Sequence, residues 1–166
     1  MKIYVISGKG YGKTPLSAFD RALMDTGVYN YNLIRLSSII PKGSMVEEIK
    51  KFNAPENQYG HKLYVVRAEI RSNHPRYFIG AGIGWYQLGD RRGVFVEHEV
   101  IARDEKSAKE DLSQKIIYSL SDLCEFRNFP FDRKKARIKL SVCEIKDKKE
   151  AGCALVLAVY KAEGWK

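Results

Sequence analysis

The sequence predicts an α+β fold with a mostly antiparallel sheet. At least five segments have the apolar runs or the alternation of strands, and most of them follow one another through short turns, in hairpin order. Two segments instead show helical periodicity. At 166 residues, with 45% hydrophobic and 30% charged residues, the chain has the size and composition of one globular domain. We therefore expect residues 1–166 to form a single domain.

The first segments predict a strand, a loop and a helix. Residues 3–6 form an apolar strand, and the glycine-rich residues 7–14 predict a loop. That loop is a near miss to the phosphate-binding pattern G-x-x-x-x-G-K-[ST], because Ser7 replaces its first glycine. We interpret it as a flexible turn before a helix. Thr14 and Pro15 suit the start of that helix, and Gly27 suits its end.

Residues 32–41 predict a buried strand with an unusual centre. Five of its ten residues are large and aliphatic, two adjacent serines interrupt the apolar run, and Pro41 ends it. A hydroxyl inside an apolar strand is costly unless it is hydrogen-bonded. The pattern alone therefore favours a bulge or strand end at which Ser37 and Ser38 bond to the backbone.

The remaining chain predicts strands and one long helix. The alternating glycines of residues 77–85 leave one strand face bare, which permits close approach by another element. Phe95 and Glu97 share one face of a later strand. The expected elements after residue 41 are a surface loop at 45–61, strands at 62–71, 77–85, 94–101, 135–145 and 153–160, and an amphipathic helix at 107–126.

The composition excludes several classes of protein and leaves one open. Three cysteines and three scattered histidines offer neither a disulfide framework nor a metal site. No apolar run has membrane-spanning length, and the N-terminus does not have the pattern of a signal peptide, so we expect a cytoplasmic protein without a membrane partner. The net charge of +9 leaves a basic nucleic-acid-binding module as an alternative. Because the charge is spread along the chain, we interpret its clusters as solvated turns.

Four segments, taken in order, resemble a known family. They are residues 12–20, 32–41, 93–99 and 151–154. Together they closely resemble the pyruvoyl-dependent arginine decarboxylases, most specifically from Gly12 to Pro41 and more loosely from Lys42 to Arg92. The resemblance implies a four-layer αββα sandwich and a homotrimer. It also implies decarboxylation of L-arginine to agmatine and CO2 through a Schiff base, as a step of polyamine biosynthesis.

The resemblance also implies a covalent cofactor made from the chain itself. In this family a serine becomes a pyruvoyl group, and the cleavage chemistry maps onto Ser37 and Ser38. The Ser38 hydroxyl would attack the Ser37 carbonyl, and the resulting ester would eliminate and hydrolyse. The products would be a β chain of residues 1–37 and an α chain of residues 38–166 that begins with the pyruvoyl group. Uncleaved, the chain would be a zymogen.

Three further residues match family positions, and two neighbours accompany them. Asn32 matches the asparagine that assists cleavage, and Glu97 matches the proton donor, with Glu99 as the less favoured candidate on the same face. Asp20 matches the aspartate that binds the guanidinium group, and Leu16 would line the same pocket. Judged from pattern alone, Asp20 reads as an ordinary solvent-exposed helix carboxylate, Asn32 as a turn residue and Glu97 as an edge-strand carboxylate.

Departures from the family pattern leave alternatives to the implied function. Tyr29 and Tyr31 are bulkier than the family residues before Asn32, and the middle segment is altered. The chain could therefore be a pyruvoyl-dependent decarboxylase of another amino acid. A relative that keeps the fold without processing, or a basic module that binds nucleic acid as an intact polypeptide, are the other readings.

Overall fold

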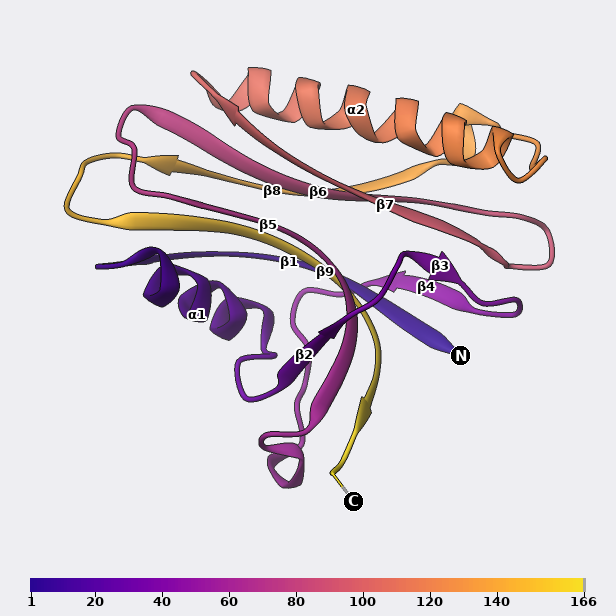
Figure 1. The fold of residues 1–166 in the computed structure, drawn as a ribbon, viewed down its shortest axis with the longest axis horizontal. Coiled ribbons are helices and arrows are strands. Elements are labelled where there is room, and N and C mark those ends of the chain that lie inside the picture. The colour runs from indigo at the N-terminus through magenta and orange to yellow at the C-terminus, as the bar shows by residue number, and fades with distance from the viewer. Residues whose placement is uncertain (166) are drawn as a thin grey trace.

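The computed structural model describes residues 1–165, which form two β-sheets packed face to face between two helices (Figure 1). The five-stranded sheet contains, in spatial order, β2 (Asn32–Arg35), β5 (Lys62–Ser72), β9 (Ala151–Glu163), β1 (Lys2–Gly12) and β4 (Met45–Glu48). The four-stranded sheet contains β3 (Ile39–Ile40), β7 (Gly93–Ala102), β6 (Tyr77–Gln87) and β8 (Arg137–Ile145). Most neighbours are antiparallel, whereas β1–β4 and β2–β5 are parallel. The predicted α+β class is confirmed.

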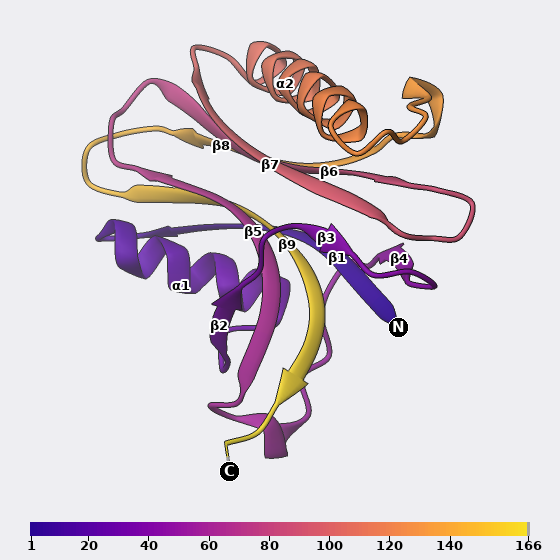
Figure 2. The ribbon, with the colours of Figure 1, turned by 45° about the vertical axis from the view of Figure 1, so that its right-hand side comes forward.

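Four layers follow from where the apolar side chains point. Helix α1 (Pro15–Thr26) covers the outer face of the five-stranded sheet, and α2 (Glu105–Glu125) covers the outer face of the four-stranded sheet (Figure 2). The inner faces of the sheets share one core, in which Phe95 and Ile83 meet Val156. The opposite face of β9 packs under α1 through Leu155 and Leu157. This burial on both faces explains why β9 is apolar almost throughout.

The ends of α1 are set by the residues that predicted them. The Thr14 side chain accepts a hydrogen bond from the Ser17 N–H, and the Ser17 hydroxyl reciprocates at the Thr14 N–H. Pro15 opens the helix, and Gly27 closes it with a left-handed φ of +87°. The predicted helix is therefore confirmed from cap to cap.

The predicted loop at residues 7–14 is wrong, because β1 continues through it to Gly12, paired with β9. A side chain at Gly10 would overlap the backbone of α1 at Ala18 and Ala22. Glycine is needed here so that the helix can lie close to the strand. In β6 the close approach predicted from the alternating glycines is confirmed, since a side chain at Gly84 would overlap Ile116 of α2.

Residues 32–41 do not form one buried strand. β2 lies at the edge of the five-stranded sheet and β3 at the edge of the four-stranded sheet. The side chains of Ile34 and Ile39 are 37% and 49% exposed. Residues 36–38 are the link between two edges, so the apolar run reflects a change of sheet rather than a continuous buried strand.

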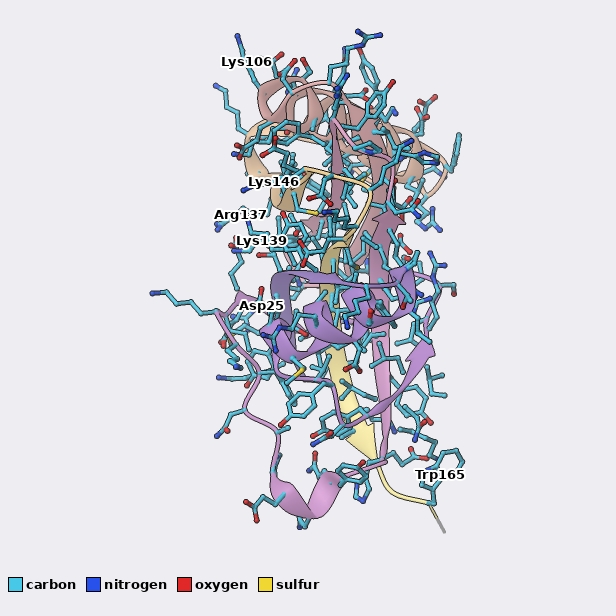
Figure 3. All side chains as sticks on the ribbon, turned by 90° about the vertical axis from the view of Figure 1, so that its left-hand side faces the viewer. Asp25, Lys106, Arg137, Lys139, Lys146 and Trp165 are labelled. Carbon is cyan, nitrogen blue, oxygen red and sulfur yellow. The ribbon has the colours of Figure 1, made fainter. Side chains whose placement is uncertain are left out.

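Smaller elements complete the chain. The predicted surface loop at 45–61 contains β4 and a short 3-10 helix at Glu56–Gln58, and a second 3-10 helix at Arg133–Lys135 precedes β8. Side chains, including the basic ones Lys106, Arg137, Lys139 and Lys146, project outward over the helices and strand ends in Figure 3. Neither helix in residues 1–165 combines the length and the apolar character that a membrane span needs.

Candidate active site

The serine pair lies where the chain passes from one sheet to the other, as Figure 2 shows between β2 and β3. The last contact with the five-stranded sheet is the Leu36 N–H, which donates to the Val65 carbonyl at 2.8 Å. The first contact with the four-stranded sheet is the Phe95 N–H, which donates to the Ser38 carbonyl at 2.8 Å. The Ser37–Ser38 peptide bond is thus held from both sides.

Ser38 has a strained backbone and a carboxylate partner. Its φ of +70° lies in the left-handed region, which non-glycine residues adopt at a cost of about 1–3 kcal/mol. Its hydroxyl donates to Glu97 Oε2 at 2.8 Å. The pattern alone favoured a hydroxyl bonded to backbone, whereas the structure pairs Ser38 with a side chain 59 residues away.

Glu97 reaches Ser38 because of the alternation of β7. Phe95 points into the core between the sheets, so Glu97 points to the same side, farther along the strand than the short pairing with β3. Its side chain is 17% exposed, and its Oε1 lies 3.8 Å from Nη2 of Arg35 on β2. Glu99, the second candidate, instead accepts a hydrogen bond from the Glu69 N–H at 3.2 Å. Of these two carboxylates, Glu97 is the one that contacts Ser38.

Two residues at this contact were not predicted. Arg35 pairs with Glu97, and Tyr160 of β9 donates from its hydroxyl to the Ile39 carbonyl at 2.8 Å. Burial, and secondly the charge of Glu97, raise the pKa of Tyr160, so its phenol stays protonated. A tyrosine at the end of an apolar run is usually a core residue, so nothing in the local sequence indicated a role for Tyr160.

Within one protomer, the Asn32 side chain lies away from the Ser37 carbonyl. Asn32 and Leu36 are four positions apart along the paired strand, a rise of roughly 13 Å. The Asn32 amide donates to the Gly60 carbonyl at 2.6 Å, and its N–H donates to the His61 carbonyl at 2.8 Å. The structure does not bring Asn32 to the Ser37 carbonyl of its own protomer.

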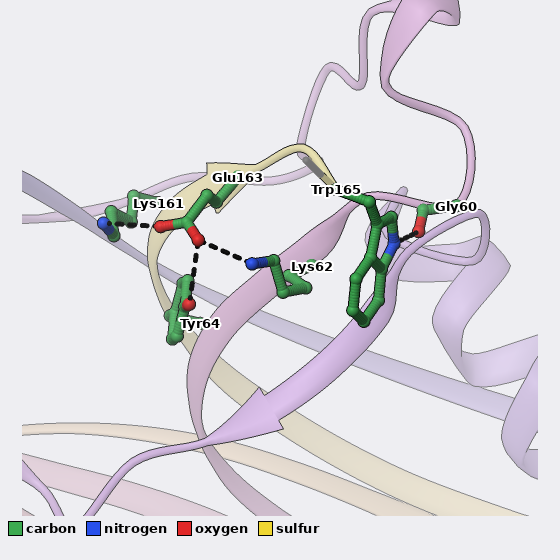
Figure 4. A network of polar contacts seen from close by, with 6 residues as sticks. All are labelled: Gly60, Lys62, Tyr64, Lys161, Glu163 and Trp165. Atoms are coloured by element: carbon green, nitrogen blue, oxygen red, sulfur yellow. Dashed lines mark hydrogen bonds and ion pairs between the residues drawn. The ribbon is translucent and has the colours of Figure 1, made fainter.

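A polar network surrounds Gly60, whose carbonyl accepts the Asn32 amide (Figure 4). The Gly60 carbonyl also accepts the Trp165 indole N–H at 2.9 Å, and the Lys62 ammonium lies 5.1 Å from the centre of that ring. Glu163 accepts from Lys62 at 2.6 Å and from Lys161 at 3.1 Å. These hydrogen bonds, first of all that from Lys62, lower the pKa of Glu163 to about 2. The end of β9 is thereby fastened beside the start of β5.

Asp20 and Leu16 lie on α1, on the far side of the five-stranded sheet from β7. Both side chains are exposed, Leu16 by 68%. Their neighbour Phe19 packs under the guanidinium group of Arg71, which is 4.0 Å from the ring centre. Within residues 1–165, no hydrogen bond or ion pair joins Asp20 to Ser38 or Glu97. The predicted substrate-binding pair is therefore apart from the serine in a single protomer.

The two bulky tyrosines before Asn32 differ in their surroundings. Tyr31 is buried, packs edge-on against Phe52 and donates to Gln58. Tyr29 is 45% exposed. Both line a surface cavity of about 250 Å³ together with Tyr59. Tyr31 is thus part of the fold, whereas Tyr29 is free to contact a ligand or a neighbour.

Comparisons with known proteins find the same family in each case. A family model described as pyruvoyl-dependent arginine decarboxylase matches residues 2–164. A protein of that name from Pyrococcus furiosus is 30% identical over 158 residues, which cover 94% of this chain and 93% of the relative. One from Halobacterium salinarum is 29% identical over 160 residues, covering 96% and 93%. One from Methanococcoides burtonii is 32% identical over 121 residues, covering 70% and 67%.

Proposed function

The chain belongs to the pyruvoyl-dependent arginine decarboxylase family, and we propose from this premise that it converts L-arginine to agmatine and CO2 with a pyruvoyl group made from its own Ser38. The agmatine would serve polyamine biosynthesis. The observation that supports this most is the 2.8 Å contact between the Ser38 hydroxyl and Glu97. In this contact, the residue that would become the ketone lies against the residue that would donate a proton.

Self-cleavage is the first step of the proposal. Ser38 Oγ attacks the Ser37 carbonyl carbon, the peptide C–N bond breaks, and an ester with a free amino group on residue 38 forms. Elimination releases the Ser37 carboxylate, and hydrolysis of the remaining dehydroalanine releases ammonia and leaves the ketone. The hydrogen bond to Glu97 holds the Ser38 hydroxyl in place, and the left-handed φ of Ser38 adds strain next to the bond to be broken.

The surroundings of residue 38 fit a pyruvoyl group. Its carbonyl accepts the Phe95 N–H, and the following residues stay paired with β7, so the new chain end keeps its attachment. A pyruvoyl group at this position would supply an electrophilic carbonyl for the substrate amine and an acceptor for the electron pair that stays behind when CO2 leaves. Glu97, beside residue 38, is the group that we assign to protonate the α-carbon.

Asp20, Leu16 and Asn32 enter the proposal through a second protomer. We assign Asp20 to the substrate guanidinium, which a carboxylate can bind through two parallel hydrogen bonds, Leu16 to the pocket wall, and Asn32 to the cleavage oxyanion. Since these residues lie apart from Ser38 in one protomer, the homotrimer is the assembly that would bring them together. Exposed Leu16, Ile34 and Ile39 supply apolar surface for such an interface.

Two further assignments, of the cellular location and of the partners, belong to the proposal. We place the protein in the cytoplasm, where arginine is available, and propose that its partners are its substrate and its own copies rather than nucleic acid. The basic residues support this view, because several of them pair with acidic neighbours, as Arg137 and Lys139 do with Glu48.

A pair of serine variants tests the function. Ser38→Ala should remain one polypeptide and release no CO2 from arginine, because alanine cannot form the ester. Ser37→Ala is the matched control and should still cleave, because residue 37 supplies only a carbonyl. CO2 release from arginine, ornithine, lysine, histidine and aspartate tests the substrate. A Ser38→Ala protein as active as the wild type would refute the function, and preference for another amino acid would refute the substrate.

A further inference from the structure

Of the two chain ends that the proposed cleavage would create, Tyr160 contacts the start of the α chain. Breaking the Ser37–Ser38 bond leaves residues 38–40 as the start of the α chain, with the pyruvoyl group at its tip. β3, which holds this start, pairs with β7 over only Ile39 and Ile40. Ile40 is buried, whereas Ile39 is 49% exposed and adds little packing. The position of the tip therefore depends on a few hydrogen bonds.

Two of these bonds come from opposite sheets. The Ser38 carbonyl points to β7, where it accepts the Phe95 N–H at 2.8 Å. Successive carbonyls of a strand point to opposite sides, so the Ile39 carbonyl points away from β7, to the open side of this edge strand. There the Tyr160 hydroxyl donates to it at 2.8 Å. The chain start is thus held between the four-stranded sheet and a side chain of the five-stranded sheet.

The Tyr160 ring is itself fixed. It packs edge-on against Phe95, with ring centres 6.2 Å apart, and lies on the core-facing side of β9 with Val156 and Ala158. Phe95 is fully buried and is the residue whose N–H holds Ser38. A ring set against Phe95 holds its hydroxyl at a constant place relative to Ser38 and Glu97.

We infer that Tyr160 is a positioning residue of the mature enzyme, which holds the pyruvoyl-bearing end of the α chain against Glu97 through the Ile39 carbonyl. This inference rests on the proposed function. It assigns Tyr160 no contact with the substrate and no proton transfer. Small displacements of reacting groups reduce turnover strongly, whereas the binding of arginine at a carboxylate depends on other residues. Loss of the Tyr160 hydroxyl should therefore lower kcat and leave KM unchanged.

Tyr160→Phe tests the inference, because it removes the hydroxyl and keeps the ring on Phe95. We expect complete cleavage and a wild-type ketone content by titration with phenylhydrazine. We expect kcat to fall about tenfold, the equivalent of one lost hydrogen bond, with KM for arginine unchanged. Tyr118→Phe is the matched control, since it also removes a hydrogen-bonded hydroxyl, but on α2, and should leave kcat unchanged.

Three results would overturn the inference. A wild-type kcat in Tyr160→Phe would show that the hydroxyl does not matter. An uncleaved Tyr160→Phe protein would place Tyr160 in the cleavage step instead, and a rise in KM at constant kcat would place it in substrate binding. Failure of the function itself has a different signature, namely a wild-type protein that lacks the ketone.

Discussion

At Ser38 three constraints act on one residue. Its φ is positive, its carbonyl is bonded to β7, and its hydroxyl is bonded to Glu97. Both partners, Phe95 and Glu97, lie on β7, so Ser38 cannot relax without losing its contacts with that strand. Such a strained and doubly bonded serine is consistent with the reactive role proposed for Ser38.

The role of Glu97 can be separated from that of Ser38. Glu97→Gln should still self-cleave, because the amide oxygen of Gln can accept the Ser38 hydroxyl in the same place. It should lose at least about a hundredfold in kcat, because an amide cannot donate the proton that the α-carbon needs. Fragment analysis and CO2 release measure the two effects. Glu99→Gln is the control, and equal losses in both variants would contradict the assignment.

Asp20 makes a prediction about binding rather than turnover. Asp20→Asn removes the charge and keeps the shape of the side chain, so the fold should be unaffected at this exposed helix position. A charged hydrogen bond to guanidinium is typically worth about 1.5–3 kcal/mol, so KM for arginine should rise at least about tenfold. Steady-state kinetics on arginine measure this. An unchanged KM would remove Asp20 from the substrate site.

Among the elements, local signals predicted those whose ends are set locally. Thr14, Pro15 and Gly27 fixed α1, because capping depends on residues within one turn. The glycines of β1 predicted a loop instead, because the reason for them is a helix that packs on the strand, and the sequence does not say which element packs where. The link at residues 36–38 was missed for a similar reason, since periodicity does not reveal which sheet an apolar residue joins.

Some residues of the candidate site could likewise be predicted from the sequence, and others could not. The resemblance pointed to Ser38 and Glu97 by their motifs, and the structure puts these two residues in contact. Arg35 and Tyr160 also lie at this place, although neither of them was assigned a role from the sequence. Arg35 lies on β2 and Tyr160 on β9, and both reach residues of the other sheet. These contacts depend on how the two sheets pack, which the sequence alone does not show.

The network at the end of β9 predicts a dependence of stability on pH. The pKa of Glu163 is lowered from 4.5 to about 2, so its carboxylate stabilises the fold above pH 4.5, and this contribution disappears as the pH falls toward 2. Glu163→Gln should therefore unfold at lower urea concentration than the wild type at pH 7, by a difference that shrinks below pH 4.5. A difference independent of pH would contradict the account.

In the whole molecule, the serine pair lies at the edges of the two sheets. α1 and α2 cover the outer faces (Figure 1), the core fills the space between the sheets, and residues 36–38 link the edge strands β2 and β3. The β chain would comprise 37 of the 166 residues, too few to hold a core alone. Since β1, α1 and β2 belong to it, the two fragments must remain packed together after cleavage.

The mass of the purified protein tests the central claim most directly. We predict two fragments that elute together under native conditions and separate on denaturation, one ending at Ser37 and one starting at residue 38 without an α-amino group. The larger fragment should react with a ketone reagent. A well-folded protein that stays a single chain of 166 residues, with no reactive ketone after prolonged incubation, would contradict the account.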